Sequence, residues 1–168
     1  TTIVRNSFTN NQFQRALNGA AAISTMTMAP ALTTWPDGGF LLGRNANDGG
    51  DDNGVGMTMS ETIVFDKALT ANEINRVDSY LAIKGGITLD MTSTPNYLSS
   101  NSISVWTSGN NTGYNNNIFG IANDKVSDLN QMQSNSINPG QKLIIGAGSS
   151  LANTNAANTN TLTDGQFL

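Results

Sequence analysis

The stretch DKALTANEINRVDSYLAIKGGITL, residues 66–89, contains the one clear helical pattern of the sequence. Thr70 is a suitable N-cap residue, and Glu73 three positions later completes the pattern of a capping box. Gly85 is the type of residue that ends a helix in the left-handed conformation. These local signals agree with one another and predict a helix over residues 71–84.

The predicted helix has two faces. Ile74, Val77 and Leu81 recur at helical spacing and form an apolar stripe that we expect to be buried. Asn75 and Asp78 fall on the other side, which we expect to face water.

The composition excludes several classes of function. Of the 168 residues, 58 are Asn, Ser or Thr, and only 12% are charged. The net charge is −4 and the eight basic residues are scattered, which argues against nucleic acid as a partner. The chain has no His and no Cys, so it lacks the commonest general base and zinc ligand, and it has neither thiols nor disulfides.

Targeting signals are also absent from the sequence. No apolar run approaches the ~18 residues of a membrane span, so we expect no such span. No signal peptide opens the chain, and the signal of a precursor is expected to lie outside it. A cysteine-free, acidic chain that is rich in Asn, Thr and Ser is typical of a secreted or cell-surface bacterial protein.

The sequence has two regions that differ in composition and in the pattern of apolar residues. Residues 1–90 alternate short apolar segments with turn signals, including Asn18-Gly19 between two predicted strands, which favours a β-sandwich. Residues 91–168 begin with a predicted linker and continue with short strands at SISVW, NIFGIA, KLIIGA and GQFL, separated by Asn-rich loops. The nearly low-complexity stretch around residues 151–165 is expected to be a solvated loop.

The run FLLGRNANDGGDDNGVGMTMSETIVFDKALTANEINRVDSYLAIKGGITL, residues 40–89, resembles the closing third of a laminin-G-like, concanavalin-A-like jelly roll. Its extension resembles a variant found in large surface proteins of Bacteroidota and marine bacteria. The sequence at residues 105–146 and 163–168 resembles the functionally uncharacterised module that commonly follows the jelly roll in those surface proteins.

The resemblance implies a mostly β fold. Residues 1–90 would be the C-terminal portion of an antiparallel β-sandwich, an incomplete jelly roll with one capping helix. Residues 91–168 would be the N-terminal portion of a second, Asn-rich β module. A full jelly roll of this class needs about twice the residues before position 90, and unpaired strands are avoided in natural proteins. The remainder of a larger polypeptide or a partner chain is therefore expected to complete the sandwich.

The loop NANDGGDDNG, residues 45–54, is the candidate metal site. It gathers carboxylate and amide oxygens among glycines, and such ligands suit Ca²⁺. Sandwiches of the laminin-G type often bind calcium at a rim loop. The predicted ligands are Asp48, Asp51, Asp52 and Asn53. The alternative is a solvated, turn-rich hairpin, because the spacing does not match an EF-hand.

Glu61 lies in a predicted strand and, if alternation is regular, faces the same side as Ile63 and Phe65. A carboxylate there needs a partner, either Arg76 or free backbone N–H groups near the helix start. The structural interpretation is that Glu61 joins helix to strand, although a bulge could turn it outward. A catalytic acid is the other interpretation, but the second carboxylate that glycoside hydrolysis requires is missing nearby.

Trp35 and Tyr114 are candidate ligand-binding residues, because aromatic rings pack well against sugars. Trp35 precedes the turn at Pro36 and is expected to be exposed, whereas Trp106 is expected to pack in the core.

These features favour a non-catalytic binding or spacer module of a modular adhesin, which recognises a glycan or a surface protein through rim loops. One alternative is the accessory region of a polysaccharide-degrading enzyme. Another is a structural segment that assembles through strand edges.

Overall fold

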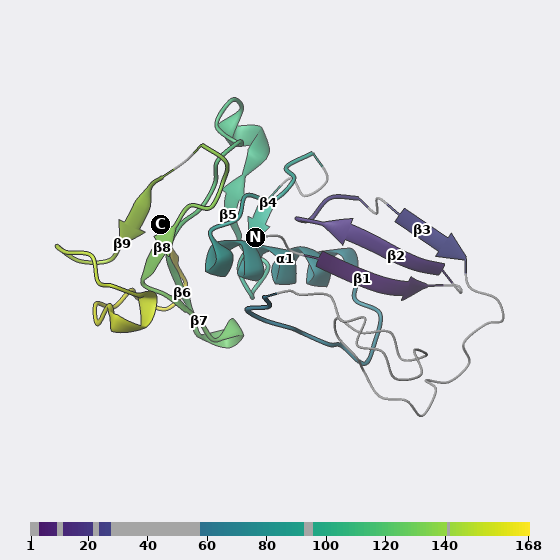
Figure 1. Cartoon of the computed structure of the whole chain (residues 1–168), viewed down its shortest axis with the longest axis horizontal. Helices are drawn as coiled ribbons and strands as arrows, with labels where there is room; N and C mark the ends of the chain where they lie inside the picture. The colour runs from purple at the N-terminus through teal and green to yellow at the C-terminus, as the bar shows by residue number, and fades with distance from the viewer. Residues whose placement is uncertain (1–3, 10–11, 22–23, 28–57, 93–95, 141) are drawn as a thin grey trace.

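The computed structural model describes residues 4–9, 12–21, 24–27, 58–92, 96–140 and 142–168. These residues form small antiparallel sheets and the single helix α1 (Ala71–Gly85) (Figure 1). The prediction of a mostly β chain with one helix is confirmed. The sheets are not closed, so the sandwich remains a prediction.

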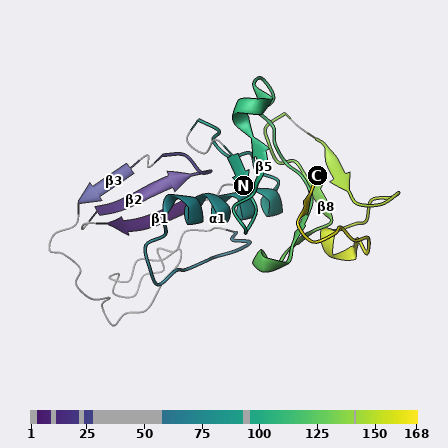
Figure 2. The ribbon, with the colours of Figure 1, turned by 180° about the vertical axis from the view of Figure 1, so that it is seen from behind.

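A three-stranded sheet occupies the N-terminal region. Its strands β1 (Val4–Thr9), β2 (Gln12–Leu17) and β3 (Ser24–Thr27) pair antiparallel in chain order. Asn18 and Gly19 follow β2 with φ of 48° and 77°, as predicted for a tight turn between strands. This sheet lies at one end of α1 and the C-terminal strands lie at the other (Figures 1 and 2).

The C-terminal half contains three small sheets. Strand β4 (Asn96–Leu98) pairs with β5 (Ser104–Thr107), and β8 (Gln133–Asn135) pairs with β9 (Ile144–Gly146). Strand β6 (Ala122–Asp124) lies between β7 (Leu129–Gln131) and β10 (Gln166–Phe167). Short 3₁₀ turns are η1 (Ser108–Asn111), η2 (Lys125–Ser127) and η3 (Asn155–Ala157). Strand β4 lies in the predicted linker, and that prediction was wrong.

Helix α1 begins with the predicted capping box. The backbone N–H of Glu73 donates to Thr70 Oγ1 at 3.3 Å, and the N–H of Thr70 donates to Glu73 Oε2 at 2.8 Å. The predicted end was wrong by one residue, because Gly85 is helical and Gly86 adopts the left-handed cap with φ of 63°. A Cβ on Gly86 would lie 2.2 Å from the carbonyl oxygen of Asn135, so this close approach requires glycine.

The buried face of α1 differs from the predicted one. Asp78, Ser79, Ala82 and Ile83 are buried, whereas the predicted stripe is only partly buried, so the assignment of Asp78 to the solvent was wrong. Ser79 is tolerated because its hydroxyl donates to the carbonyl oxygen of Asn75 and accepts from the N–H of Leu98.

The main core joins α1 to the C-terminal strands. Ala82 and Ile83 pack with Leu89, Tyr97 and Leu129. The hydroxyl of Tyr97 accepts from the N–H of Leu89 at 2.8 Å, and burial raises the pKa of this phenol to about 12. A domain boundary at residue 90, which remains a prediction, would divide this core.

Candidate functional site: a groove beside helix α1

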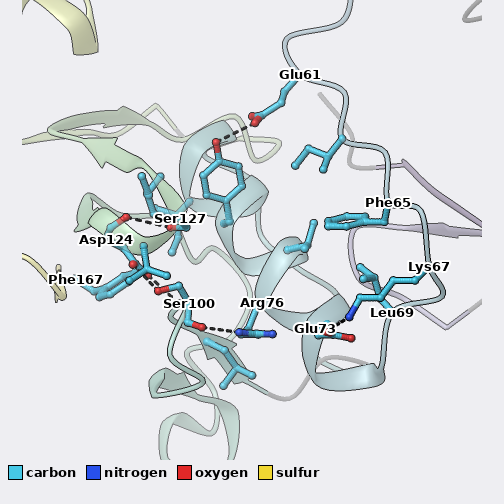
Figure 3. A pocket seen from close by; sticks show the side chains of 17 residues that line it. Glu61, Phe65, Lys67, Leu69, Glu73, Arg76, Ser100, Asp124, Ser127 and Phe167 are labelled. Atoms are coloured by element: carbon cyan, nitrogen blue, oxygen red, sulfur yellow. Dashed lines mark hydrogen bonds and ion pairs between the residues drawn. The ribbon is translucent and has the colours of Figure 1, made fainter.

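An open groove of about 480 Å³ runs beside α1. We call it the α1 groove, and Figure 3 shows its side chains. One wall is the segment 61–69, the floor is α1, and the other wall comes from β4, β6, β7, η2 and β10. Most lining side chains are apolar: Ile63, Phe65, Leu69, Val77, Ile83, Leu98, Val126, Leu129 and Phe167.

Segment 61–69 alternates as a strand does. The odd-numbered residues Glu61, Ile63, Phe65, Lys67 and Leu69 all line the α1 groove, and the residues between them do not. A period of two is the signature of an extended strand. No strand is assigned between residues 58 and 70, and no backbone hydrogen bond joins residues 58–69 to another described residue. The side chains of this segment therefore alternate as predicted for a strand. In the described part of the chain, however, no neighbouring strand is hydrogen-bonded to it.

Both ends of this segment are held by α1. Glu61 Oε1 accepts from the hydroxyl of Tyr80 at 2.9 Å (Figure 3). Glu61 Oε2 lies 3.0 Å from Lys84 Nζ. Lys67 Nζ lies 2.8 Å from Glu73 Oε1 in the first turn of the helix. The segment therefore runs antiparallel to α1.

The distance along the helix shows that the segment is extended. The eleven residue steps between Glu73 and Lys84 cover about 16 Å at about 1.5 Å per residue. The six steps from Glu61 to Lys67 cover about 20 Å in an extended chain but only about 9 Å in a helical one. Only the extended chain is long enough to span the distance between Glu73 and Lys84 on the helix.

The partners of Glu61 differ from those that the sequence suggested. The predicted partners were Arg76 or backbone N–H groups at the helix start, whereas Tyr80 and Lys84 in the last turns hold the carboxylate. Helical position explains this result, since Tyr80 and Lys84 are four residues apart and lie on one face.

The ionisable groups of α1 that hold the ends of the segment each have one protonation state at neutral pH. Hydrogen bonds from Lys67 and from Thr70 lower the pKa of Glu73 to about 2. The hydrogen bond with Tyr80 raises the pKa of Lys84, and burial raises the pKa of Tyr80. At neutral pH Glu73 is therefore a carboxylate, Lys84 an ammonium and Tyr80 a neutral phenol.

Arg76 and Asp124 are the other charged residues of the groove. Arg76 Nη1 donates to the carbonyl oxygen of Ser100 at 2.7 Å, while its Nε is buried without a hydrogen-bond partner. Asp124 is buried, and its carboxylate accepts from the N–H and the hydroxyl of Ser100 at 2.8 and 2.6 Å. Arg76 forms no ion pair with any residue that the structure describes.

Of the remaining predicted site residues, only Tyr114 is described by the structure, and it does not line this groove. The predicted calcium ligands and Trp35 lie outside the described residues: Trp35, Asp48, Asp51, Asp52 and Asn53. Within the described ranges, no three acidic side chains gather to hold a metal ion. Tyr114 is 78% exposed, and its role in binding remains a prediction. Trp106 packs against the core as expected, and its indole N–H donates to Asn115.

The Asn-rich stretch contains structural residues that the sequence did not reveal. Asn155 accepts from the N–H groups of Met132 and Gln133 at 2.6 and 2.8 Å. Asn158 is buried and donates to the carbonyl oxygens of Met132 and Ala147. The prediction of a wholly solvated loop was wrong, because these amides hydrogen-bond to the backbone beside β7, β8 and β9.

Comparison with known families identifies the C-terminal half. Residues 73–168, more than half of the chain, match a family model described as a domain of unknown function, DUF8202. The chain belongs to the DUF8202 family. The DUF8202 region begins within α1 and includes every C-terminal sheet. No curated protein and no solved structure matches the chain. In the part of the chain that the structure describes, no helix has the length and apolarity needed to cross a membrane.

Proposed function

We propose that this chain is a non-catalytic binding or spacer module of a secreted or cell-surface bacterial adhesin. Its N-terminal part would belong to a laminin-G-like jelly roll, and the missing strands would come from the remainder of a larger polypeptide or from a partner chain. The observation that carries the proposal is segment 61–69, which has the alternation of a strand and no described strand beside it.

A strand that has apolar side chains and no partner strand among the described residues favours association. Ile63, Val64 and Phe65 are 41%, 64% and 45% exposed. Natural proteins cover or disrupt such edges, because free N–H and C=O groups are a template for pairing. The ion pairs at both ends of the segment hold it in an extended form before any partner arrives, which lowers the entropic cost of binding.

The charges of the groove support binding over catalysis. Glycoside hydrolysis requires two carboxyl groups that face the substrate, one of them with a raised pKa. In the α1 groove Glu61 and Glu73 are each held by a lysine, and the pKa of Glu73 is lowered instead of raised. Asp124 is buried and occupied by Ser100. These contacts support structural roles for the three carboxylates.

Surface labelling tests this function. Antibodies raised against the purified chain should label intact source cells and detect a polypeptide well above 17.7 kDa. Labelling only after the cells are permeabilised would contradict the proposal. Peptide sequencing of the same band decides between the adhesin and the accessory region of an enzyme, because the second requires a polysaccharide-degrading domain in the same polypeptide.

The unpaired segment also supports a second candidate, assembly of like chains through strand edges. Light scattering of the purified chain over a range of concentrations separates the two. A mass that stays at 17.7 kDa supports the binding module, and a mass that rises with concentration supports assembly.

A further inference from the structure

We infer that the α1 groove binds a single strand of a separate polypeptide, with apolar side chains at alternate positions and one carboxylate that pairs with Arg76. This inference rests on the proposed binding function and specifies its partner. It follows from three features of the groove: the backbone of segment 61–69, which no described strand pairs with, the half-exposed apolar walls, and the Nε of Arg76, which has no hydrogen-bond partner among the described residues.

The free backbone indicates a polypeptide and not an aliphatic ligand. Any ligand that covers the groove also removes water from the edge of segment 61–69. An aliphatic chain would leave the N–H and C=O groups at this edge without partners, which is costly. A strand laid alongside the segment would satisfy them, as in other cases of strand addition to an open edge.

The walls of the groove define the side chains of the partner. Ile63 and Phe65 face the groove but remain about half exposed, and Val126 on the opposite wall is 71% exposed. Residues directly opposite one another in paired strands point to the same face of the sheet. Every second residue of the added strand would therefore point toward α1 and the opposite wall, and these positions should be apolar.

Arg76 defines the charge of the partner. Its guanidinium has five N–H donors, of which Nη1 is engaged by Ser100, while the buried Nε has no acceptor. The groove's lysine is already paired, since Lys67 holds Glu73. A carboxylate is the ligand that satisfies the donors of a guanidinium best, because it accepts two hydrogen bonds in parallel.

A second copy of this chain does not have the required chemistry in its own exposed strand. In segment 61–69 the carboxylate of Glu61 is held by Tyr80 and Lys84 of its own chain. Asp66 is on the face that does not line the groove. Segment 61–69 of a second copy therefore does not supply the added strand, and we assign the partner to a different polypeptide segment.

Synthetic peptides test this assignment on the purified chain. The probe is a short capped peptide of alternating valine and threonine, with lysine at both ends and one glutamate that is moved through the central positions. The matched probe has glutamine in its place. Calorimetry gives the affinity, and amide chemical shifts locate the contact. We expect the best glutamate peptide to bind about tenfold more tightly than its glutamine match. Shifts should concentrate in residues 61–69.

Variants of the chain give a second, independent comparison. Arg76→Gln should abolish the difference between the two peptides, whereas Lys142→Gln, which removes an exposed charge away from the groove, should preserve it. Should Arg76→Gln fail to fold, the comparison of glutamate and glutamine peptides on the unaltered chain still tests whether a carboxylate contributes to binding.

N-methylation along one edge of the peptide should abolish binding by blocking the backbone pairing.

Four results would overturn the inference: no binding by any peptide, equal affinity for the two peptides, unchanged binding after N-methylation of either edge, or displacement of the peptide by decanoate at equal affinity. Self-association that is lost in Val126→Lys, which changes an exposed side chain of the groove, but not in Ile103→Lys, a similarly exposed control outside it, would assign the groove to a second copy instead. If no peptide binds while antibodies still label the cell surface, this inference fails and the proposed function stands.

Discussion

Replacement of Asn155 by alanine should destabilise the DUF8202 region although the residue lies in a loop that resembles low-complexity sequence. Its side chain forms three hydrogen bonds: Oδ1 accepts from the N–H groups of Met132 and Gln133, and Nδ2 donates to the carbonyl oxygen of Asn130 at 2.9 Å. The alanine variant removes all three. It leaves the N–H groups of Met132, between β7 and β8, and of Gln133, at the start of β8, without this acceptor, and Met132 is only 3% exposed.

The expected loss follows from these contacts. Each of the three hydrogen bonds contributes about 1 kcal/mol net to the free energy of unfolding. The sum is about 2–3 kcal/mol. For a chain of this size, such a change lowers Tm by about 4–12 °C.

Urea unfolding followed by tryptophan fluorescence measures this loss, and two further variants control for its cause. Asn155→Asp retains an oxygen acceptor for both N–H groups and loses only the bond to Asn130, so it should cost about 1 kcal/mol. Asn153→Ala changes an exposed residue and should stay within about 0.5 kcal/mol of the unaltered chain. Equal stability of the Asn155→Ala and Asn153→Ala variants would refute the structural role of Asn155.

Four further predictions concern stability and metal binding. Thr70→Ala should lower the free energy of unfolding by about 1 kcal/mol in urea, because it removes the N-cap, whereas Thr70→Ser should not. Glu73 contributes stability above its ordinary pKa of 4.5, and this contribution should be lost as the pH falls toward 2. The Tm of Glu73→Gln should therefore fall less over this range. Tyr97 titrates near 12 in the folded chain instead of 10, so its burial should cease to stabilise as the pH rises from 10 to 12. Tyrosinate absorbance and Tm should change together there. Joint replacement of Asp51 and Asp52 by alanine should abolish any calcium-induced rise in Tm, and an unchanged response would exclude the loop as the calcium site.

The helix could be predicted from the sequence because its signals are local. The capping box depends on residues three positions apart, and both of its hydrogen bonds are present. Whether Gly85 or Gly86 forms the C-cap depends instead on a contact that is distant in sequence. The carbonyl of Asn135, about fifty positions further along the chain, decides which glycine cannot carry a side chain. Contacts of that sequence separation leave no local pattern.

Strands β5, β9 and β10 overlap the predicted stretches SISVW, KLIIGA and GQFL, whereas β7 and β8 could not be predicted, for a related reason. The sequences of β7 and β8, LNQ and QSN, contain none of the β-branched or aromatic residues that favour strands. Three residues cannot display a period of two with any certainty. These strands are instead stabilised by partners distant in sequence, including the amides of Asn155 and Asn158, so their existence depends on tertiary contacts.

Segment 61–69 shows why alternation alone does not establish a sheet. Its alternation was correctly predicted from Glu61, Ile63 and Phe65, but the sequence pattern is the same whether a neighbouring strand is present or absent. What holds the segment straight is α1, through the ion pairs of Glu61 and Lys67. The segment precedes the DUF8202 match, whereas both anchoring residues on the helix lie within it. Helix α1 is therefore shared: one face completes the DUF8202 core, and the other positions a strand of the preceding region. A strand that enters the α1 groove would contact both regions at once, and its binding would stabilise their relative position.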